Sequence, residues 1–257
     1  MSLHYRLFVT DVDGTIMGGQ HGISPETKAA VCLLKSRGVM VTLATGRNLW
    51  EAEPIVQELE IECPVILANG AQVYDYTSEK LLYGKNLEWF NVIEFLKEYV
   101  NVGILASWHD GTNWNDLPLS QFLEICELLT IKRIILELPP GLNLRSSSGS
   151  PFWAFRDGET QYEITPKSAE KGDGLEQLCT ILGVQSSQTV TLGNDINDIS
   201  LIERAGVGFA VGDSVDRLKR CADGVLAPLR DEPILAVTRW LLGEVSWEAL
   251  VATKNCK

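Results

Sequence analysis

Two aspartates separated by a single residue follow the first apolar segment of the chain. Asp11 and Asp13 follow the apolar stretch 5–9 with one threonine between, and Gly14 allows a sharp turn behind them. If that stretch is a buried strand, its tip presents both carboxylates. An ionised carboxylate can attack phosphorus without a base, and a second carboxylate whose pKa is raised by its neighbour can carry a proton. The pair therefore predicts separate roles, a nucleophile in Asp11 and a general acid in Asp13.

A calcium-binding loop is a competing interpretation of the same acidic segment. Such a loop has a glycine at its sixth position and a glutamate at its twelfth. Counted from Asp11, these positions hold Ile16 and Gly22, so the calcium template fails. An ordinary acidic turn after a strand stays open as the alternative.

Composition limits the class of protein. The chain has 257 residues, of which 45% are hydrophobic and 22% charged, and this is typical of a globular protein with a substantial core. No apolar stretch reaches the roughly 18 residues that cross a bilayer, and residues 1–6 lack a secretory signal. We therefore expect a cytoplasmic protein without membrane contact. A net charge of −12 opposes binding to nucleic acid, and it calls for a bound cation if the substrate carries phosphate.

Strand and helix patterns alternate at both ends of the chain, which is typical of a parallel sheet covered by helices. The expected strands span 5–9, 39–44, 64–68, 189–192, 207–211 and 225–226. The expected helices span 25–37, 48–60, 172–182, 198–205, 214–221 and 233–242. Residues 243–257 show no clear pattern.

The middle of the chain breaks this alternation. The expected hairpin strands are 73–76 and 80–83, and beyond them we expect helices at 87–99 and 118–129 and strands at 103–108, 131–138, 152–155 and 161–165. The predicted fold class is α/β, with a Rossmann-like parallel-sheet core and an inserted α+β module that acts as a lid. We place the core at 1–84 and 163–257 and the insert at 85–162. In the insert, Trp108, Trp114 and Trp153 either line a substrate pocket or pack in the interior.

Further polar groups follow other predicted strands or precede a helix, where open α/β sheets place their ligands. Thr45 and Gly46 offer a hydroxyl and a backbone N–H before a helix, which suits an anion. Arg47 beside them either contacts substrate or pairs with a surface carboxylate. Lys171 precedes the helix 172–182, and for this reason we prefer it to Lys167 as the phosphate-binding lysine. The segment 193–198 supplies hard oxygen ligands of the kind that select Mg²⁺.

In this order, these segments resemble the haloacid dehalogenase superfamily, and within it the Cof-type metabolite phosphatases. Residues 11–15 are similar to the first motif of the family, 45–47 to the second, 171–172 to the third and 193–198 to the fourth. The turn at 69–71 also resembles the family, and the insert is similar to its cap domain.

The resemblance implies a role for each matching residue. It implies that Asp11 forms an aspartyl-phosphate and that Asp13 protonates the leaving alcohol and then activates water. The remaining implied roles are phosphate binding by Thr45, Gly46 and Lys171, contact with substrate or cap by Arg47 and Asn69, and Mg²⁺ binding by Asp11, Asp13, Asp198 and either Asn194 or Asp195.

One position departs from the family pattern. The fourth motif usually has an aspartate after its glycine as a direct Mg²⁺ ligand, and here that position is Asn194. Its amide oxygen can still coordinate, although a neutral ligand binds a cation less strongly, and the carboxylate of Asp195 is the alternative. The sequence leaves this choice open.

The sequence thus predicts a Mg²⁺-dependent phosphatase acting on a small phosphorylated metabolite, such as a sugar phosphate, through an aspartyl-phosphate. A phosphomutase or phosphotransferase of the same superfamily is the near alternative. A non-catalytic member that binds a metabolite is the distant one, and only Asn194 favours it. The oligomeric state cannot be read from the sequence.

Overall fold

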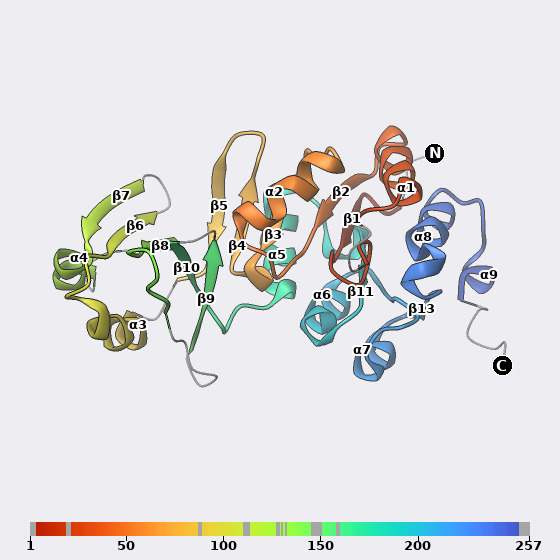
Figure 1. Cartoon of the computed structure of the whole chain (residues 1–257). Helices are drawn as coiled ribbons and strands as arrows, with labels where there is room; N and C mark the ends of the chain where they lie inside the picture. The colour runs from red at the N-terminus through yellow and green to blue at the C-terminus, as the bar shows by residue number, and fades with distance from the viewer. Residues whose placement is uncertain are drawn as a thin grey trace.

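The structure is a computed structural model of the chain. It describes residues 4–18, 22–86, 89–109, 114–126, 129, 131, 133–144, 151–157 and 160–251. The chain forms two bodies, which we call the core and the cap (Figure 1). The described residues toward both ends of the chain belong to the core, and the cap is built from the middle of the chain.

Five parallel strands form the core sheet within the described residues, in the order β13-β12-β11-β1-β2. Their bounds are β1 Leu7–Thr10, β2 Met40–Leu43, β11 Thr189–Gly193, β12 Val207–Ala210 and β13 Gly224–Val225. All four residues of β1 are buried because helices cover both faces of the sheet. Phe8 packs into one hydrophobic cluster, while Leu7 and Val9 pack into another on the opposite face.

The helices of the core begin at strong sequence signals. In α1, Pro25–Ser36, the Ser24 side chain accepts a hydrogen bond from the N–H of Thr27, and Pro25 occupies the first turn. In α2, Leu49–Glu58, Asn48 and Glu51 cap one another reciprocally. The other core helices are α5 Lys171–Leu182, α6 Ile199–Arg204, α7 Asp216–Cys221, α8 Pro233–Leu241 and α9 Trp247–Val251. Helices α1, α2 and α8 bury residues in the cluster of Phe8, and α5 and α6 bury residues in the cluster of Leu7 and Val9.

A small antiparallel sheet extends the core toward the cap. It consists of β3 Val65–Leu67, β4 Gln72–Asp75 and β5 Lys80–Gly84. An isolated bridge between Ala44 and Ile66 joins it to the end of β2. Between β3 and β4 the chain makes a short 3-10 turn, η2 Ala68–Gly70.

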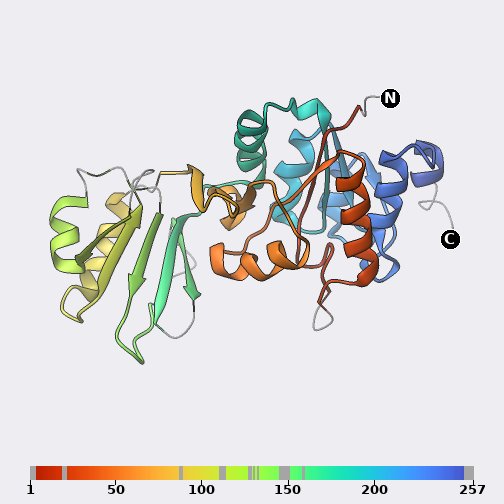
Figure 2. The same cartoon turned by 90° about the horizontal axis from the view of Figure 1, so that it is seen from above.

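The cap has its own sheet and its own interior. Its antiparallel strands follow the order β7-β6-β8-β10-β9 in the described residues. The elements are β6 Leu105–His109, β7 Trp114–Pro118, β8 Arg133–Glu137, β9 Phe152–Asp157, β10 Gln161–Pro166, α3 Trp89–Leu96 and α4 Leu119–Ile125. Both helices cover the face of the sheet that points away from the core (Figure 2). Trp108 is buried in this interior against Phe122, whereas the side chains of Trp114 and Trp153 lie outside the described residues.

The predicted fold class is confirmed, and the element order agrees with the prediction except at two places. Strand β7 was missed because Asn115 and Asp116 disfavour strands, and only its edge position tolerates them and Pro118. Residues 243–257 have no clear pattern in the sequence, and residues 247–251 of this segment form α9, which contacts the core through Trp247 and Phe209.

The division into core and cap stays a proposal, and strand pairing adjusts one boundary of it. Strand β10 pairs with β8 up to Ile164 and with β9 up to Pro166, so a boundary after residue 162 would cut a strand of the cap sheet. We therefore propose that the cap ends at Pro166. Within the described ranges, no helix has both the length and the apolar character needed to pass through a lipid bilayer.

Candidate active site

Asp11 lies immediately beyond β1, at the carboxyl edge of the core sheet. Its N–H donates to the carbonyl of Leu192 in the neighbouring strand, at 2.9 Å. Its side chain is buried, with the residue 5% exposed. The Thr15 hydroxyl donates to Oδ2 at 2.9 Å, and Lys171 Nζ donates to Oδ1 at 2.6 Å. These two donors hold the carboxylate at the tip of the strand, as the sequence predicts.

Lys171 is the first residue of α5 and is fully buried. Its ammonium lies between two carboxylates, with Nζ 2.6 Å from Asp11 Oδ1 and 2.5 Å from Asp198 Oδ1. The other oxygen of Asp198 accepts the N–H groups of Asn194 and Asp195, at 2.9 and 3.1 Å. Both oxygens of Asp198 are therefore engaged by donors of the protein.

Burial sets the protonation of this cluster. It raises the pKa of Asp11 to about 6, because desolvation and the charge of Asp198 outweigh the attraction of Lys171. Burial by itself lowers the pKa of Lys171, but the carboxylates of Asp11 and Asp198 outweigh it and leave that pKa raised. The lysine is thus a permanent cation beside a carboxyl group whose charge depends on what binds there.

Asp13 lies on the more open side of the site, and its side chain is 56% exposed. Arg47 binds it with two hydrogen bonds, from Nε to Oδ2 at 2.9 Å and from Nη2 to Oδ1 at 2.8 Å. The third nitrogen of Arg47 donates to the carbonyl of Glu51 at 3.1 Å. Of the two interpretations of Arg47, the structure displays the ion pair with a carboxylate, and that carboxylate belongs to the predicted acid.

The loop after β2 brings Thr45 and Gly46 to the same edge of the sheet. Thr45 is fully buried, and its N–H donates to the carbonyl of Ile66 at 2.9 Å. Its hydroxyl accepts the N–H of Arg47 at 3.1 Å, so the loop closes on itself. A Cβ at Gly46 would lie 3.2 Å from the side chain of Asn69, which shows how closely the next loop packs here.

Asn194 and Asp195 follow β11 and have different surroundings. The amide of Asn194 lies against Gly14, where a Cβ would stand only 2.1 Å from Nδ2 of Asn194. Asp195 is exposed, and its Oδ1 accepts the N–H of Ile196 at 2.7 Å, which caps the 3-10 turn η6 Ile196–Asp198. Asn194 therefore lies next to the loop that carries Asp11 and Asp13, while the carboxylate of Asp195 accepts a hydrogen bond from the backbone of its own loop.

The family profile of the haloacid dehalogenase-like hydrolases matches residues 8–124 and 131–237, which is most of the chain. The chain belongs to this family. The predicted family, its Cof-type branch and the class of enzyme, a phosphatase, are confirmed.

Curated relatives match over nearly the whole length of this hydrolase. One is the 5-amino-6-(5-phospho-D-ribitylamino)uracil phosphatase YcsE of Bacillus subtilis, which is 26% identical over 92% of this chain and 96% of its own. Another is an HMP-PP phosphatase of Serratia proteamaculans, 24% identical over 84% of this chain and 86% of its own. A solved structure from Geobacillus kaustophilus superposes with a TM-score of 0.65 at 22% identity, covering 94% of this chain and 100% of that one. This last likeness shows the fold.

Whether this hydrolase can bind a metal ion depends on the oxygen ligands that surround Gly14. Among the described residues, no three side chains of His, Cys, Asp or Glu lie close enough to hold a metal ion. A cation here needs the amide oxygen of Asn194 or main-chain carbonyls in addition to Asp11. Such hard oxygen donors fit Mg²⁺, which commonly takes one or two carboxylates and fills its remaining positions with water and phosphate.

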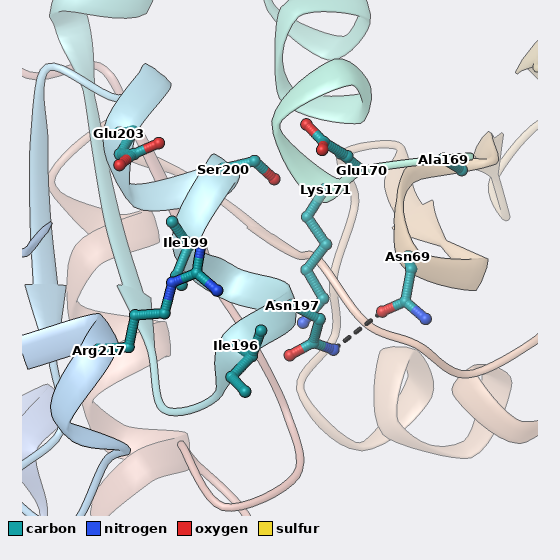
Figure 3. Close-up of a pocket in the computed structure, with 10 residues that line it drawn as sticks. All are labelled: Asn69, Ala169, Glu170, Lys171, Ile196, Asn197, Ile199, Ser200, Glu203 and Arg217. Atoms are coloured by element: carbon teal, nitrogen blue, oxygen red, sulfur yellow. Dashed lines mark hydrogen bonds between the residues drawn. The ribbon is translucent and has the colours of Figure 1, made fainter. Parts of the chain in front are cut away.

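A pocket of about 350 Å³ adjoins the site in the hydrolase (Figure 3). It shares Lys171 with the carboxylate cluster, and Asn69 and Asn197 face each other across one side of it. Sequence reasoning missed its further lining residues Ser200, Glu203 and Arg217. The position of Ser200 just after the fourth motif is the sequence feature that could have indicated it. In the structure, its hydroxyl accepts a hydrogen bond from the N–H of Gly172 at 3.1 Å.

Proposed function

We propose that this hydrolase removes the phosphoryl group of a small phosphorylated metabolite, with Asp11 as the nucleophile. The single observation that carries the proposal is the buried carboxylate of Asp11, held at the strand tip by Thr15 and Lys171. A buried ammonium beside the attacking oxygen offsets the charge of the phosphoryl oxygens, and fixed charges of this kind supply most of the acceleration in phosphoryl transfer.

The reaction has two steps in this proposal. First, an oxygen of Asp11 forms a bond to phosphorus as the ester P–O bond breaks, and Asp13 gives its proton to the leaving alcohol oxygen. Then a water oxygen attacks the phosphorus of the aspartyl-phosphate, Asp13 takes the water proton, and phosphate leaves with Asp11 restored. Because Arg47 holds both oxygens of Asp13, this pair has to open before Asp13 can act.

The cation and the phosphate ligands complete the proposed site. Mg²⁺ would be held by Asp11, the main-chain carbonyl of Asp13 and Asn194, and it would stabilise negative charge on the phosphoryl oxygens. The contact of Asn194 with Gly14 supports Asn194 over Asp195. Because protein donors occupy both oxygens of Asp198, we propose that Asp198 holds Lys171 and the loop of Asn194 in place.

Thr45, Gly46 and Lys171 would hold the phosphate oxygens. Their placement at one edge of the sheet, around Asp11, supports this role. The substrate class we propose is a sugar or sugar-alcohol phosphate. The Bacillus subtilis relative supports this choice, since its name gives a 5-phospho-D-ribityl group. The cap would cover the bound metabolite and exclude water.

Release of inorganic phosphate tests the proposal. The purified protein is assayed against hexose, pentose and ribitol phosphates, with Mg²⁺ or with EDTA in excess. We expect release that depends on Mg²⁺ and that the Asp11→Asn variant abolishes. The exposed residue Asp223 offers a matched control, because it precedes β13 at the amino edge of the parallel sheet, opposite the edge that carries Asp11, and Asp223→Asn makes the same chemical change there.

The same assay separates the alternatives. A mutase would convert the sugar phosphate without releasing phosphate, and a binding protein would show calorimetric affinity with no conversion. Trapping by acid during turnover should add the mass of one phosphoryl group to the peptide that contains Asp11. Full activity in Asp11→Asn would refute the proposal.

A further inference from the structure

The turn between β3 and β4 has a backbone conformation that few side chains adopt. In η2, Ala68 has φ of 48° and Asn69 has φ of 55°, and Ala68 is 1% exposed. Asparagine tolerates this left-handed region, but alanine does not favour it. Backbone strain of this kind persists where the surrounding structure enforces it, often beside functional sites.

The turn is bound to the loop that carries Thr45 and Gly46. The N–H of Asn69 donates to the carbonyl of Thr45 at 3.0 Å, and the N–H of Ala68 donates to the carbonyl of Arg47 at 2.9 Å. The side chain of Asn69 lies directly over Gly46, where a Cβ would meet its amide at 3.2–3.3 Å. The strained turn therefore fixes the position of one half of the proposed phosphate site.

The same turn also reaches the other half of the site. Asn197 Nδ2 donates to Asn69 Oδ1 at 2.9 Å, and Figure 3 shows this bond beside the side chain of Lys171. Asn197 precedes Asp198, which binds Lys171. Next to Asn69, Gly70 packs so tightly that a Cβ would lie 1.9 Å from the carbonyl oxygen of Glu170, the residue before Lys171.

We propose that Asn69 is a positioning residue, which sets the separation between Thr45 and Gly46 on one side of the site and Lys171 and Asp198 on the other. The inference rests on the proposed phosphatase function. It assigns Asn69 a role different from the contact with substrate or cap that the sequence suggested. Phosphoryl transfer depends on donors placed around the reacting phosphorus, so a small displacement of one half lowers the rate.

Two substitutions test the bond from its two ends. Asn69→Gly removes the side chain and keeps a residue that adopts a positive φ freely. Asn197→Ala removes the donor on the opposite loop. We expect each variant to lower kcat by about 10- to 100-fold with a smaller change in KM. The double variant should be no slower than the slower single variant, because both changes break the same link.

Orthovanadate gives a second measurement, since it adopts the geometry of the phosphoryl group in transfer. Its inhibition constant should weaken in both variants by about the factor lost in kcat, while inhibition by inorganic phosphate weakens less. Glu79→Gly is the matched control: Glu79 has the same φ of 55° in an exposed turn remote from the site, so kcat should stay within about 2-fold.

Several outcomes would overturn the inference. A rise in KM for Asn69→Gly with an unaffected Asn197→Ala would make Asn69 a substrate contact. A lower thermal midpoint with unchanged kcat in both variants would make the turn merely structural. Multiplicative losses in the double variant would show two separate roles. If the wild-type protein releases no phosphate, the proposed function fails and the inference fails with it, whereas an active wild type with active variants refutes only the role of Asn69.

Discussion

At the scale of single residues, the centre of the site is a buried lysine between two buried carboxylates. The desolvation of three charged groups is costly, and their mutual attraction offsets that cost only while all three are present. Lys171 therefore depends on Asp198 for its place, and Asp11 depends on Lys171 for any negative charge it keeps. The excess of carboxylate over ammonium gives this cluster affinity for a further cation.

The raised pKa of Asp11 leads to a pH-dependent stability of the metal-free protein. Its pKa of about 6 in the folded chain exceeds the ordinary value of 3.8, so the folded chain holds this proton more tightly than the unfolded chain. That stabilisation is complete below about pH 4, and it is lost as the pH rises through about 6, with a total of up to about 3 kcal/mol. The test compares the free energy of unfolding of the wild type with that of Asp11→Asn, both measured with urea in the presence of EDTA. We expect the difference, wild type minus variant, to fall as the pH rises from about 4 through about 6.

Asp173 supplies a control of opposite sign. Burial alone would raise the pKa of Asp173, but hydrogen bonds from Lys85 and Arg204 lower it overall. Its stabilisation is therefore present at neutral pH and lost in acid, so the difference between wild type and Asp173→Asn should shrink as the pH falls through the pKa of Asp173. A difference for Asp11→Asn that does not change with pH would contradict the assigned burial effect.

The choice between Asn194 and Asp195 as metal ligand also belongs to this scale. Asn194→Asp replaces a neutral ligand by a charged one, so Mg²⁺ should bind at least about 10-fold more tightly in a calorimetric titration. Asp195→Asn should leave the affinity unchanged, because Asp195 is exposed and caps its own loop. Loss of binding in Asp195→Asn with no gain in Asn194→Asp would assign the ligand to Asp195.

At the scale of elements, turns decide how the ends of the strands meet. Parallel strands bring their carboxyl ends to one edge, and this alone places Asp11, Thr45 and Asn194 near one another. The turn η2 and the start of α5 then close that edge, and they do so by backbone contact at Gly70. This contact leaves no space for a side chain.

Two glycines with positive φ make a matched test of this closure. Gly70 has φ of 92° and faces the backbone of Glu170, whereas Gly38 has φ of 81° and would meet nothing within 4 Å. Gly38→Ala carries only the conformational penalty, while Gly70→Ala adds a clash with backbone that cannot rotate away. We expect Gly70→Ala to lower the free energy of unfolding in urea by about 2 kcal/mol more than Gly38→Ala. Equal losses would show that η2 and α5 adjust freely.

At the scale of the whole molecule, core and cap have separate hydrophobic interiors. The cap interior gathers around Phe122, and the core sheet buries Phe209 on one face. Two chain crossings connect the bodies, and Lys85 in the first crossing donates to the carbonyl of Ser168 in the second at 2.7 Å and to Asp173 of α5 at 2.9 Å. The connection between cap and core therefore lies next to the helix that carries Lys171.

Separate interiors predict separate local stabilities. Phe122→Ala and Phe209→Ala each remove a fully buried ring, at a cost of about 3–5 kcal/mol to the body concerned. We expect Phe122→Ala to speed amide hydrogen exchange in β6, β8 and β10 while β1 and β11 keep their protection, and Phe209→Ala to affect the core strands. Loss of protection throughout the chain in both variants would mean that core and cap unfold as one unit.

The sequence by itself determined the parts of this protein that depend on local pattern. Hydrophobic period and capping residues predicted the order of strands and helices. The rule that open α/β sheets bind ligands beyond the carboxyl ends of their strands predicted that Asp11 and Thr45 would meet, and the start of a helix placed Lys171 with them. The sequence did not predict strand β7, because its composition is that of a loop and only its pairing with β6 makes it a strand. Its stability comes from a neighbour rather than from its own residues.

Only the tertiary structure decided which side chains pair. Arg47 could have faced substrate or solvent, and the fold places it on Asp13, 34 positions away. Asn69 binds Asn197, 128 positions away, and both oxygens of Asp198 turn out to be engaged within the protein. Such partners depend on loop positions that the packing of the core sets to within a few tenths of an ångström. The period and spacing of residues along one chain carry no information at that precision.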